Sequence, residues 1–266
     1  MSLSSLKVLV RGGGEQATAV AHRLHQGHFR VVIVEAPHPE AVRREVAFCE
    51  AIYDKEKTVE GVTARFIGSA DDIFGMWEKD IIPLMADPEA KVKTVLKPDV
   101  IIDATIAKRN LGNKMSDARL VIGLGVGFTA GRDVHVVIET KRGHNLGRVI
   151  RLGEAAPDTG IPGEIMGYSA ERVLRAPQAG IFTTSHSIGD IVKAGDIIAE
   201  VDGMPINAVI GGVIRGLLRN GTTVPKGMKS GDIDPRGVKE YCTTISEKGR
   251  AIAGGVLEAI LAEFNV

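Results

Sequence analysis

The sequence of 266 residues has little of several residue types, and each scarcity excludes a class of protein. Its two cysteines, Cys49 and Cys242, form neither a Cys-x-x-Cys pair nor a disulfide framework, which is typical of a reducing compartment. Lysine plus arginine equal aspartate plus glutamate at 33 each, so no net charge indicates a nucleic-acid partner. The apolar runs are too short for a membrane helix. We therefore expect a cytoplasmic protein that binds neither nucleic acid nor membrane.

Aromatic residues are also scarce, at 4%, whereas the chain has 32 glycines. Glycine permits backbone conformations that other residues avoid, so the sequence predicts many turns that are fixed by the backbone. Each cysteine is interpreted as a small buried residue rather than as a nucleophile. A role for Cys49 or Cys242 in carrying sulfur or selenium stays open, and no catalytic residue is assigned.

The stretch from Lys7 to Glu35 predicts a strand, a tight glycine turn, a helix and a second strand. The turn is Gly12-Gly13-Gly14, and Gly12, Gly14 and Ala17 have the G-x-G-x-x-A spacing of a dinucleotide-binding fingerprint. Glu35 ends the second strand where an acid that binds ribose is expected. The hypothesis is a bound nucleotide or phosphate ligand, and the alternative is a turn that serves only the packing of the helix.

Further elements follow in alternation, which favours an α/β class with a Rossmann-like, doubly wound and mostly parallel sheet. The patterns predict helices over residues 37–54 and 70–85, the second of them capped by Ser69, and strands over residues 61–68, 99–106, 119–131 and 134–139. In such sheets ligands meet the loops that leave the carboxyl ends of the strands. The polar residues of those loops are therefore candidates for the site.

Two such loops are basic, and one strand ends in closely spaced glycines. Candidate ligand-binding residues are Asp103, Lys108, Arg109 and Asn110 in the first loop, Gly123 and Gly125 in the glycine-rich strand, and Arg142, His144 and Arg148 in the second loop. Such charges suit a phosphate or pyrophosphate. The alternatives are an ordinary polar loop and plain surface charge. His144 has no second histidine at metal-binding spacing, so no metal site is expected.

An internal repeat marks a second domain. Residues 176–198 align with residues 208–233 through five pairs of equivalent residues, each pair 32 residues apart. Each copy predicts short strands joined by glycine turns, and two interlocked copies indicate a small all-β barrel-sandwich domain. This pattern resembles the biotinyl/lipoyl-carrier domains, in which the hairpin between the halves carries a modified lysine. The corresponding segment, residues 201–206, contains no lysine. We therefore expect an interaction module without biotin or lipoate.

The chain ends in an amphipathic segment that predicts a helix from about Ser246. Gly254 and Gly255 lie within it, and their cost of roughly 1 kcal/mol each against alanine suggests that the helix packs closely against another element. The expected organisation is a Rossmann-like domain over residues 1–172, a barrel-sandwich domain over 173–236 and a C-terminal helix within 237–266. The helix is expected to dock on the first domain or on a second subunit, which leaves a homo-oligomer open.

Four segments carry a resemblance to a known family: IGLGVGFTAGRDVHVVIETKRGHNLGRVI (122–150), IRGLLRNG (214–221), SGDIDPR (230–236) and ISEKGRAIAGGVLEAIL (245–261). With them the chain resembles the YqeB-type selenium-dependent molybdenum hydroxylase accessory proteins, and it is distantly similar to the xanthine dehydrogenase accessory proteins. The resemblance implies a role in maturing a molybdenum hydroxylase of the xanthine dehydrogenase type. It also implies a molybdopterin-type cofactor or a dinucleotide as ligand.

Three functions of different classes remain open at this point. The first is an accessory factor that binds the phosphorylated cofactor with the glycine turn and the two basic loops, and contacts its client enzyme through the repeat domain. The second is an NAD(P)-dependent oxidoreductase, which the glycine turn and Glu35 favour but which lacks a recognisable catalytic constellation in the sequence. The third is a scaffold or interaction protein without a ligand, in which the glycines serve only the architecture.

Overall fold

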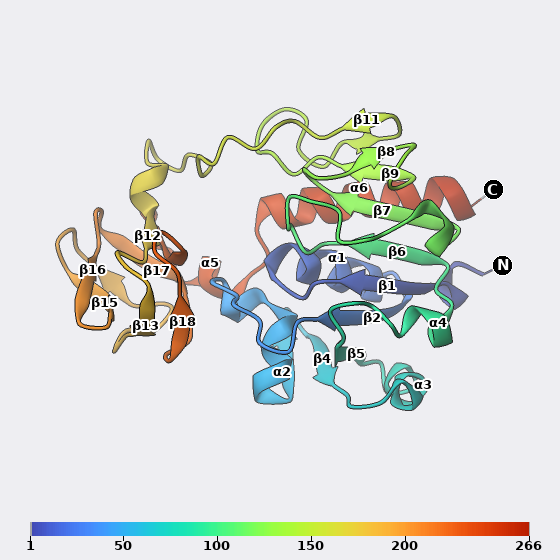
Figure 1. The fold of residues 1–266 in the computed structure, drawn as a ribbon, viewed down its shortest axis with the longest axis horizontal. Coiled ribbons are helices and arrows are strands. Elements are labelled where there is room, and N and C mark those ends of the chain that lie inside the picture. The colour runs from blue at the N-terminus through green and yellow to red at the C-terminus, as the bar shows by residue number, and fades with distance from the viewer. Residues whose placement is uncertain (1, 266) are drawn as a thin grey trace. The chain divides into compact units, whose positions relative to one another are not determined.

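The computed structural model describes residues 2–265, which form two compact units (Figure 1). The first unit contains the described chain up to Pro39, the segment Ala47–Asp158 and the chain from Ile245. The second unit contains Glu40–Val46 and Thr159–Thr244. These boundaries differ from the predicted ones. Residues 159–172 and 237–244 belong to the same unit as the repeat, and the segment Glu40–Val46 also belongs to that unit.

The first unit is built on a nine-stranded sheet with the strand order β10-β9-β7-β6-β1-β2-β5-β4-β3. Its strands are β1 (Lys7–Arg11), β2 (Arg30–Glu35), β3 (Glu56–Val59), β4 (Val62–Phe66), β5 (Ile82–Ala86), β6 (Val100–Asp103), β7 (Leu120–Leu124), β9 (Val136–Ile138) and β10 (Val149–Ile150). All neighbours pair in parallel except β3 with β4 and β9 with β10 at the two edges. Strands β8 (Thr129–Ala130) and β11 (Gly153–Glu154) form a separate antiparallel pair.

Helices cover both faces of this sheet. The α-helices are α1 (Glu15–Gln26), α2 (Ala51–Asp54), α3 (Ile73–Trp77), α4 (Lys93–Leu96) and α6 (Glu247–Phe264), and the 3₁₀ helices are η1 (Leu3–Ser5), η3 (Phe48–Glu50), η4 (Ala70–Asp72) and η5 (Met115–Asp117). Helix α6 packs against α1, where a side chain at Gly249 would meet the Cβ of Ala19. The opposite face has its own core, in which Leu9 and Ile101 of the central strands pack with Ile73 and Phe128. A mixed α/β fold with a large, mostly parallel sheet and a C-terminal helix confirms that part of the prediction.

Two of the predicted helices are wrong, each for a physical reason. Residues 37–54 form only turns, two 3₁₀ helices and α2, because the chain divides here between the two units: the Val42 carbonyl accepts a hydrogen bond of 2.8 Å from the Leu217 amide, and Glu40–Val46 belongs to the second unit. The helix that Ser69 caps ends at Trp77, and the apolar run after it is strand β5. Asp80 has a φ of 57° between the two, which ends helical geometry.

The second unit contains two four-stranded antiparallel sheets, with the orders β12-β19-β17-β14 and β16-β15-β13-β18. Its strands are β12 (Val173–Arg175), β13 (Gly180–Thr183), β14 (Ile191–Val192), β15 (Ile197–Val201), β16 (Met204–Asn207), β17 (Gly212–Leu217), β18 (Thr222–Val224) and β19 (Lys229–Asp234), with helices η2 (Arg44–Val46), η6 (Ala170–Arg172) and α5 (Glu240–Thr243). Each strand of the first repeat copy, β12 to β15, has its counterpart in β16 to β19. If each strand in the order β12-β19-β17-β14 is replaced by its counterpart in the other copy, the result is the order β16-β15-β13-β18 of the second sheet.

The equivalence extends to the backbone. Gly180 and Gly212, which are 32 residues apart, have φ values of +154° and +153°, and a side chain at either would overlap the acidic residue Asp202 or Asp234 respectively. Because β13 pairs with β18 and β14 pairs with β17, each sheet takes strands from both copies. The copies are therefore interlocked. Among the described residues, no helix is long and apolar enough to cross a membrane.

The adjacent glycines of α6 provide a matched pair of substitutions. A Cβ at Gly255 would overlap the carbonyl oxygen of Gly147, whereas the nearest atom to a Cβ at Gly254 is the Arg23 Nη1 at 4.0 Å. We expect Gly254→Ala to raise the free energy of unfolding by up to about 1 kcal/mol, because alanine favours the helix. Gly255→Ala is expected to lower it by about 1–3 kcal/mol through overpacking. Urea unfolding followed by circular dichroism measures both, and equal effects would contradict the assigned packing.

Candidate functional site

Four loops leave the carboxyl ends of neighbouring parallel strands β9, β7, β6 and β1 at one edge of the sheet. In the sheet, β2 follows β1 on one side, and β6, which comes later in the chain, neighbours β1 on the other side. The direction in which strands are added therefore reverses between β1 and β6, which makes this boundary a topological switch point. In open α/β sheets ligands bind at such a point. The sequence-predicted candidates Gly12–Gly14, Asp103 and Lys108–Asn110 belong to the two loops that meet here.

Glycines let these loops lie against one another. A Cβ at Gly12, whose φ is +96°, would come within 3.0 Å of the Ala104 carbonyl oxygen in the loop after β6. A Cβ at Gly127 would overlap the backbone of Arg109, and a Cβ at Gly125 would overlap the Thr140 side chain. Gly123 serves a different purpose, since its missing side chain makes room for the Phe128 ring. The four loops therefore form one continuous rim along the carboxyl edge of the sheet.

The glycine turn is partly occupied by the protein's own groups. The Gly13 amide donates a hydrogen bond of 2.7 Å to the Glu35 carboxylate, whose other oxygen accepts one of 2.6 Å from the Ala36 amide. The Gly13 carbonyl accepts a 2.9 Å hydrogen bond from the Cys49 amide, and Cys49 packs on Gly13. At Gly14, which caps α1, no atom beyond Gly14 and its two chain neighbours lies within 4 Å of where a Cβ would be. Gly14 is thus the position of the turn that is open to a ligand.

A buried polar network fixes the loop after β6. Arg11 and Asp103 are register partners on β1 and β6, and the Arg11 Nη1 lies 3.4 Å from the Asp103 Oδ2. Asn113 joins both side chains, accepting from Arg11 at 2.5 Å and donating to Asp103 at 2.5 Å. The other Asp103 oxygen accepts a 2.6 Å hydrogen bond from the Thr105 hydroxyl. Asp103 and Asn110 are therefore structural, and Asn110 in turn accepts from the Asn113 amide at 2.8 Å.

The same loop contains backbone strain. Ile106 and Lys108 have φ values of 55° and 59°, a left-handed conformation that is especially unfavourable for a β-branched residue such as isoleucine. Lys108 is exposed and its Nζ lies 2.5 Å from the Asp158 carboxylate, while the Arg109 side chain is exposed. Strain of this kind persists only where the surroundings enforce it, and it is concentrated at functional sites. The strained residues lie between Asp103 and Asn113, which the network joins to Arg11.

The loop after β9 carries the remaining predicted residues, and its charges have separate environments. Arg142 forms an ion pair with Glu247 at the start of α6. Arg148 lines a cavity of about 470 Å³ together with Arg151 and the buried Glu139. Both Glu139 oxygens accept backbone hydrogen bonds of 2.7 Å, from Lys141 and from Ala156, so this carboxylate shapes the loop. His144 is exposed.

The structure thus places the predicted candidates in or directly beside the rim loops, except Gly123, which lies within β7. Of these candidates, Gly14, Lys108, Arg109, His144 and Arg148 face outward or open space. Sequence reasoning missed Arg11 and Asn113, which hold the loop after β6 in place. The only signal for Arg11 is a charged residue at the end of an apolar strand. Within residues 2–265, no group of three or more His, Cys, Asp or Glu side chains is arranged to hold a metal ion.

Both cysteines are buried. Burial raises the pKa of the Cys242 thiol, and the nearby charges of Arg43 and Arg215 offset this only in part. The thiol is therefore protonated at neutral pH and unreactive as a nucleophile.

The network around Arg11 yields a stability prediction. Asp103→Ala leaves the buried Arg11 guanidinium without its carboxylate, and we expect it to lower the free energy of unfolding by about 3–5 kcal/mol. Glu56→Ala breaks a surface pair with Arg65 and is expected to cost less than about 1 kcal/mol. Chemical unfolding of the two variants measures the difference. A loss at Asp103 no larger than that at Glu56 would show that the network does not hold the loop.

The cysteines yield a prediction about reactivity. In the native protein at pH 8, we expect iodoacetamide to modify Cys242 at least about tenfold more slowly than in urea, because burial and a raised pKa both reduce thiolate exposure. The rate is expected to increase as the pH rises toward the raised pKa. Mass spectrometry with Cys49→Ser as the parent assigns the modification, and faster labelling of the native protein would identify a reactive thiol.

Comparison with known proteins adds one sequence relative and several distant structural neighbours. No family model matches the chain. A protein from Escherichia coli strain K12 described as "Uncharacterized protein YqeB" is 48% identical over 254 residues. The match includes 96% of this chain and 47% of that protein, so the chain spans about half the length of this relative.

Among solved structures, the chain matches an aspartoacylase family protein from Mesorhizobium loti at 13% identity and a TM-score of 0.28, covering 86% of this chain and 85% of that one. The ectoine utilisation protein EutE from Ruegeria pomeroyi matches at 12% identity and a TM-score of 0.23, covering 85% and 56%. Scores this low support no conclusion about fold or function.

Proposed function

We propose that the protein is an accessory factor in the maturation of a selenium-dependent molybdenum hydroxylase, and that it binds a phosphate-bearing molybdopterin-type or nucleotide ligand. The pathway rests on the sequence resemblance, carried by residues 122–150, 214–221, 230–236 and 245–261. The ligand class rests on the geometry of the rim at the carboxyl edge of the sheet.

The observation that carries the ligand class is the meeting of an open glycine and a strained basic loop at the switch point. Gly14 is the N-cap of helix α1, and the amino end of a helix attracts anions through its amides and its dipole. Across the boundary, the Arg11–Asp103–Asn113 network holds the loop that presents Lys108 and Arg109. Glu15 at the start of α1 opposes an anion, but its carboxylate accepts a hydrogen bond of 3.2 Å from the Ser246 hydroxyl. An anion at Gly14 would thus meet the backbone amides of α1, with Lys108 and Arg109 of the neighbouring loop as its candidate cations.

An NAD(P)-dependent oxidoreductase is the second candidate, and the glycine turn favours it. The position of Glu35 argues against it, because both carboxylate oxygens already accept backbone amides of Gly13 and Ala36. A ribose-binding acid offers these oxygens to the hydroxyls of the cofactor. A ligand held chiefly by its phosphate, at Gly14 and the basic loops, leaves the Glu35 contacts intact.

We further propose that the second unit is a barrel-sandwich module that contacts the client enzyme. Two sheets that exchange strands between repeat copies support this assignment. The β15–β16 hairpin, where a carrier domain has its lysine, reads Val201-Asp202-Gly203-Met204. The unit exposes several large apolar side chains, namely Ile181, Ile191, Ile197, Met204 and Val209. Apolar groups at such a surface suit a protein partner better than a covalently attached cofactor.

Ligand binding at the rim is tested by removing its exposed charges. We expect the protein purified from cells that make molybdopterin to retain a phosphate-bearing ligand detectable by mass spectrometry. We expect Lys108→Gln combined with Arg148→Gln to weaken binding of that ligand at least about tenfold, because two charge-assisted contacts are lost. Arg65→Gln, which removes an exposed charge from β4 at the far side of the sheet order, is the matched control.

Titration with NADH followed by fluorescence distinguishes the two candidates. Binding of NADH together with turnover of a carbonyl substrate would replace the accessory function with an oxidoreductase. If no phosphate-bearing ligand is retained and the double variant behaves like Arg65→Gln, the rim is not a phosphate site.

A further inference from the structure

A cavity that the proposed function does not use lies at the amino edge of the nine-stranded sheet, opposite the rim. Its volume is about 280 Å³, and it is formed where α1 leads into β2 and where α3 leads into β5. Both strands begin at this edge, since β2 and β5 pair in parallel. Pockets for small molecules begin at about 300 Å³, so this cavity suits a ligand smaller than a nucleotide cofactor.

The two helices end beside this cavity in the same way. After α1, the Phe29 amide donates a hydrogen bond of 3.0 Å to the Leu24 carbonyl. The His28 amide donates one of 2.8 Å to the His25 carbonyl. The same pair of bonds ends α3, with Asp80 in the place of His28. Both ends are therefore Schellman motifs, which require one residue in the left-handed conformation.

The left-handed residues of these motifs are unusual. Helices most often have glycine at this position, but here His28 has a φ of 62° and Asp80 has a φ of 57°. Both residues line the cavity. Strained backbone positions are concentrated at functional sites. The chain thus presents an imidazole and a carboxylate to the cavity where helices usually have glycine.

Aromatic side chains form a wall of the cavity. Trp77 is the only tryptophan of the chain, and its indole N–H donates a hydrogen bond of 2.8 Å to the Val31 carbonyl, which fixes the ring. The Phe74 ring meets it edge-on with the ring centres 5.3 Å apart, and Phe74 is 56% exposed. An exposed aromatic group against a fixed ring can pack on the apolar part of a ligand.

Charges of both signs line the same cavity without pairing to each other. The Arg30 guanidinium lies 5.8 Å from the centre of the Trp77 ring. Among residues 2–265, neither Arg30 nor Glu78 takes part in an ion pair, although both line the cavity together with Asp80. The cation and the two acids are therefore held apart across the cavity.

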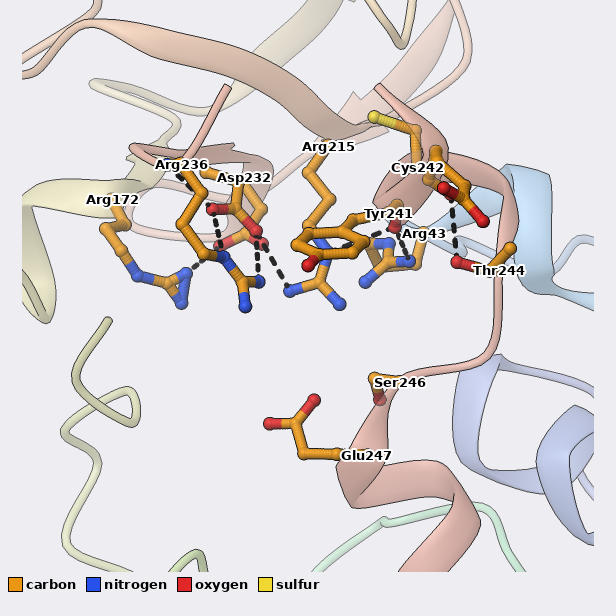
Figure 2. Close-up of polar contacts among 12 residues, drawn as sticks. Arg43, Arg172, Arg215, Asp232, Arg236, Tyr241, Cys242, Thr244, Ser246 and Glu247 are labelled. Atoms are coloured by element: carbon orange, nitrogen blue, oxygen red, sulfur yellow. Dashed lines mark hydrogen bonds and ion pairs between the residues drawn. The ribbon is translucent and has the colours of Figure 1, made fainter. Parts of the chain in front are cut away.

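Arginines of the second unit show the contrasting arrangement, in which each guanidinium contacts a carboxylate directly. Arg172 lies 3.1 Å from Asp232, and Arg236 donates to both oxygens of Asp234 at 2.9 and 2.6 Å (Figure 2). Arg30 has acids at the same cavity but contacts neither of them. Its charge is available to a ligand.

The charge of Asp80 is available as well. Its carboxylate lies 3.4 Å from the His25 Nε2, but burial lowers the pKa of His25, and Asp80 opposes this only in part. The imidazole is therefore neutral at neutral pH and does not balance the carboxylate. The Asp80 side chain is 89% exposed, so a ligand can reach it.

We infer that this cavity binds a zwitterionic α-amino acid with an apolar side chain, at a site separate from the rim. Arg30 binds the carboxylate of the ligand, and Asp80 and Glu78 bind its ammonium group. Phe74 and Trp77 pack on its side chain. A ligand with one sign of charge leaves the opposite charge of the cavity unmatched. A phosphate is opposed by two acids and by the negative carboxyl ends of two helices.

Fluorescence of Trp77 tests this inference, because the chain has no other tryptophan. We expect L-phenylalanine to bind at least about tenfold more tightly than phenethylamine, which lacks the carboxylate, or phenylpropionate, which lacks the ammonium group. Equal affinities for the three compounds would identify an apolar cavity without charge recognition. That result, or no fluorescence change with L-phenylalanine, would overturn the inference.

Two charge variants separate the two ends of the ligand. We expect Arg30→Gln to weaken binding of L-phenylalanine at least about tenfold without weakening phenethylamine, because only the carboxylate contact is lost. We expect Asp80→Asn to weaken L-phenylalanine and phenethylamine without weakening phenylpropionate. Asparagine tolerates the left-handed conformation, so this variant keeps the end of α3.

Lys79→Gln and Asp71→Asn are the matched controls, because both residues are exposed and neither lines the cavity. We expect both to bind L-phenylalanine like the parent. If Arg30→Gln and Asp80→Asn behave like these controls, the charges of the cavity do not recognise the ligand and the inference is wrong.

The rim is separated by its own variant. We expect the Lys108→Gln and Arg148→Gln double variant to bind L-phenylalanine like the parent. Loss of L-phenylalanine binding in that variant would place the amino acid at the rim and overturn the inference. The inference does not depend on the proposed function, since retention of a phosphate-bearing ligand is measured separately.

Discussion

The contact between Arg11 and Asp103 is the constraint on which the candidate site depends. These charges are register partners on the two central strands, and they meet where the direction of strand addition reverses. A buried charge requires its partner, so the pair, with Asn113, fixes the relative height of the strand ends and the path of the loop between them. The strained backbone at Ile106 and Lys108 lies between Asp103 and Asn113, the two positions of the loop that this network joins.

Much of the first unit could be predicted from the sequence where its signals are local. The turn at Gly12–Gly14 and the end of β2 at Glu35 follow from apolar runs and glycine spacing over a few residues. The helix predicted over residues 70–85 is wrong in its last part, where the structure has strand β5. An apolar run of that length suits a helix or a strand, and pairing with the parallel neighbours β2 and β4 decides for the strand. The pairing of Arg11 with Asp103 depends on strand order, which no local pattern contains.

The candidate site shows the same division. Sequence position brought Asp103, Asn110 and Lys108 together as possible ligand groups, but the fold assigns the first two to internal hydrogen bonds and leaves the lysine at the surface. Glu35 was expected from its place in the chain, yet its contacts with Gly13 and Ala36 depend on how closely the two strand ends approach. In the second unit, the regular spacing of glycines revealed the repeat, because it is a local pattern that recurs after 32 residues.

The short segment Glu40–Val46 gives the chain an unusual order of assembly. The Val42 carbonyl accepts from the Leu217 amide, and the Arg44 guanidinium donates to the Leu217 carbonyl at 2.7 Å, so this piece completes the side of β17. On the ribosome it emerges some 170 residues before its partner strand exists. The repeat unit is consequently not a module that a gene could exchange as one contiguous fragment. The contacts between Glu40–Val46 and β17 can form only after β17 has been synthesised and the two segments have come together.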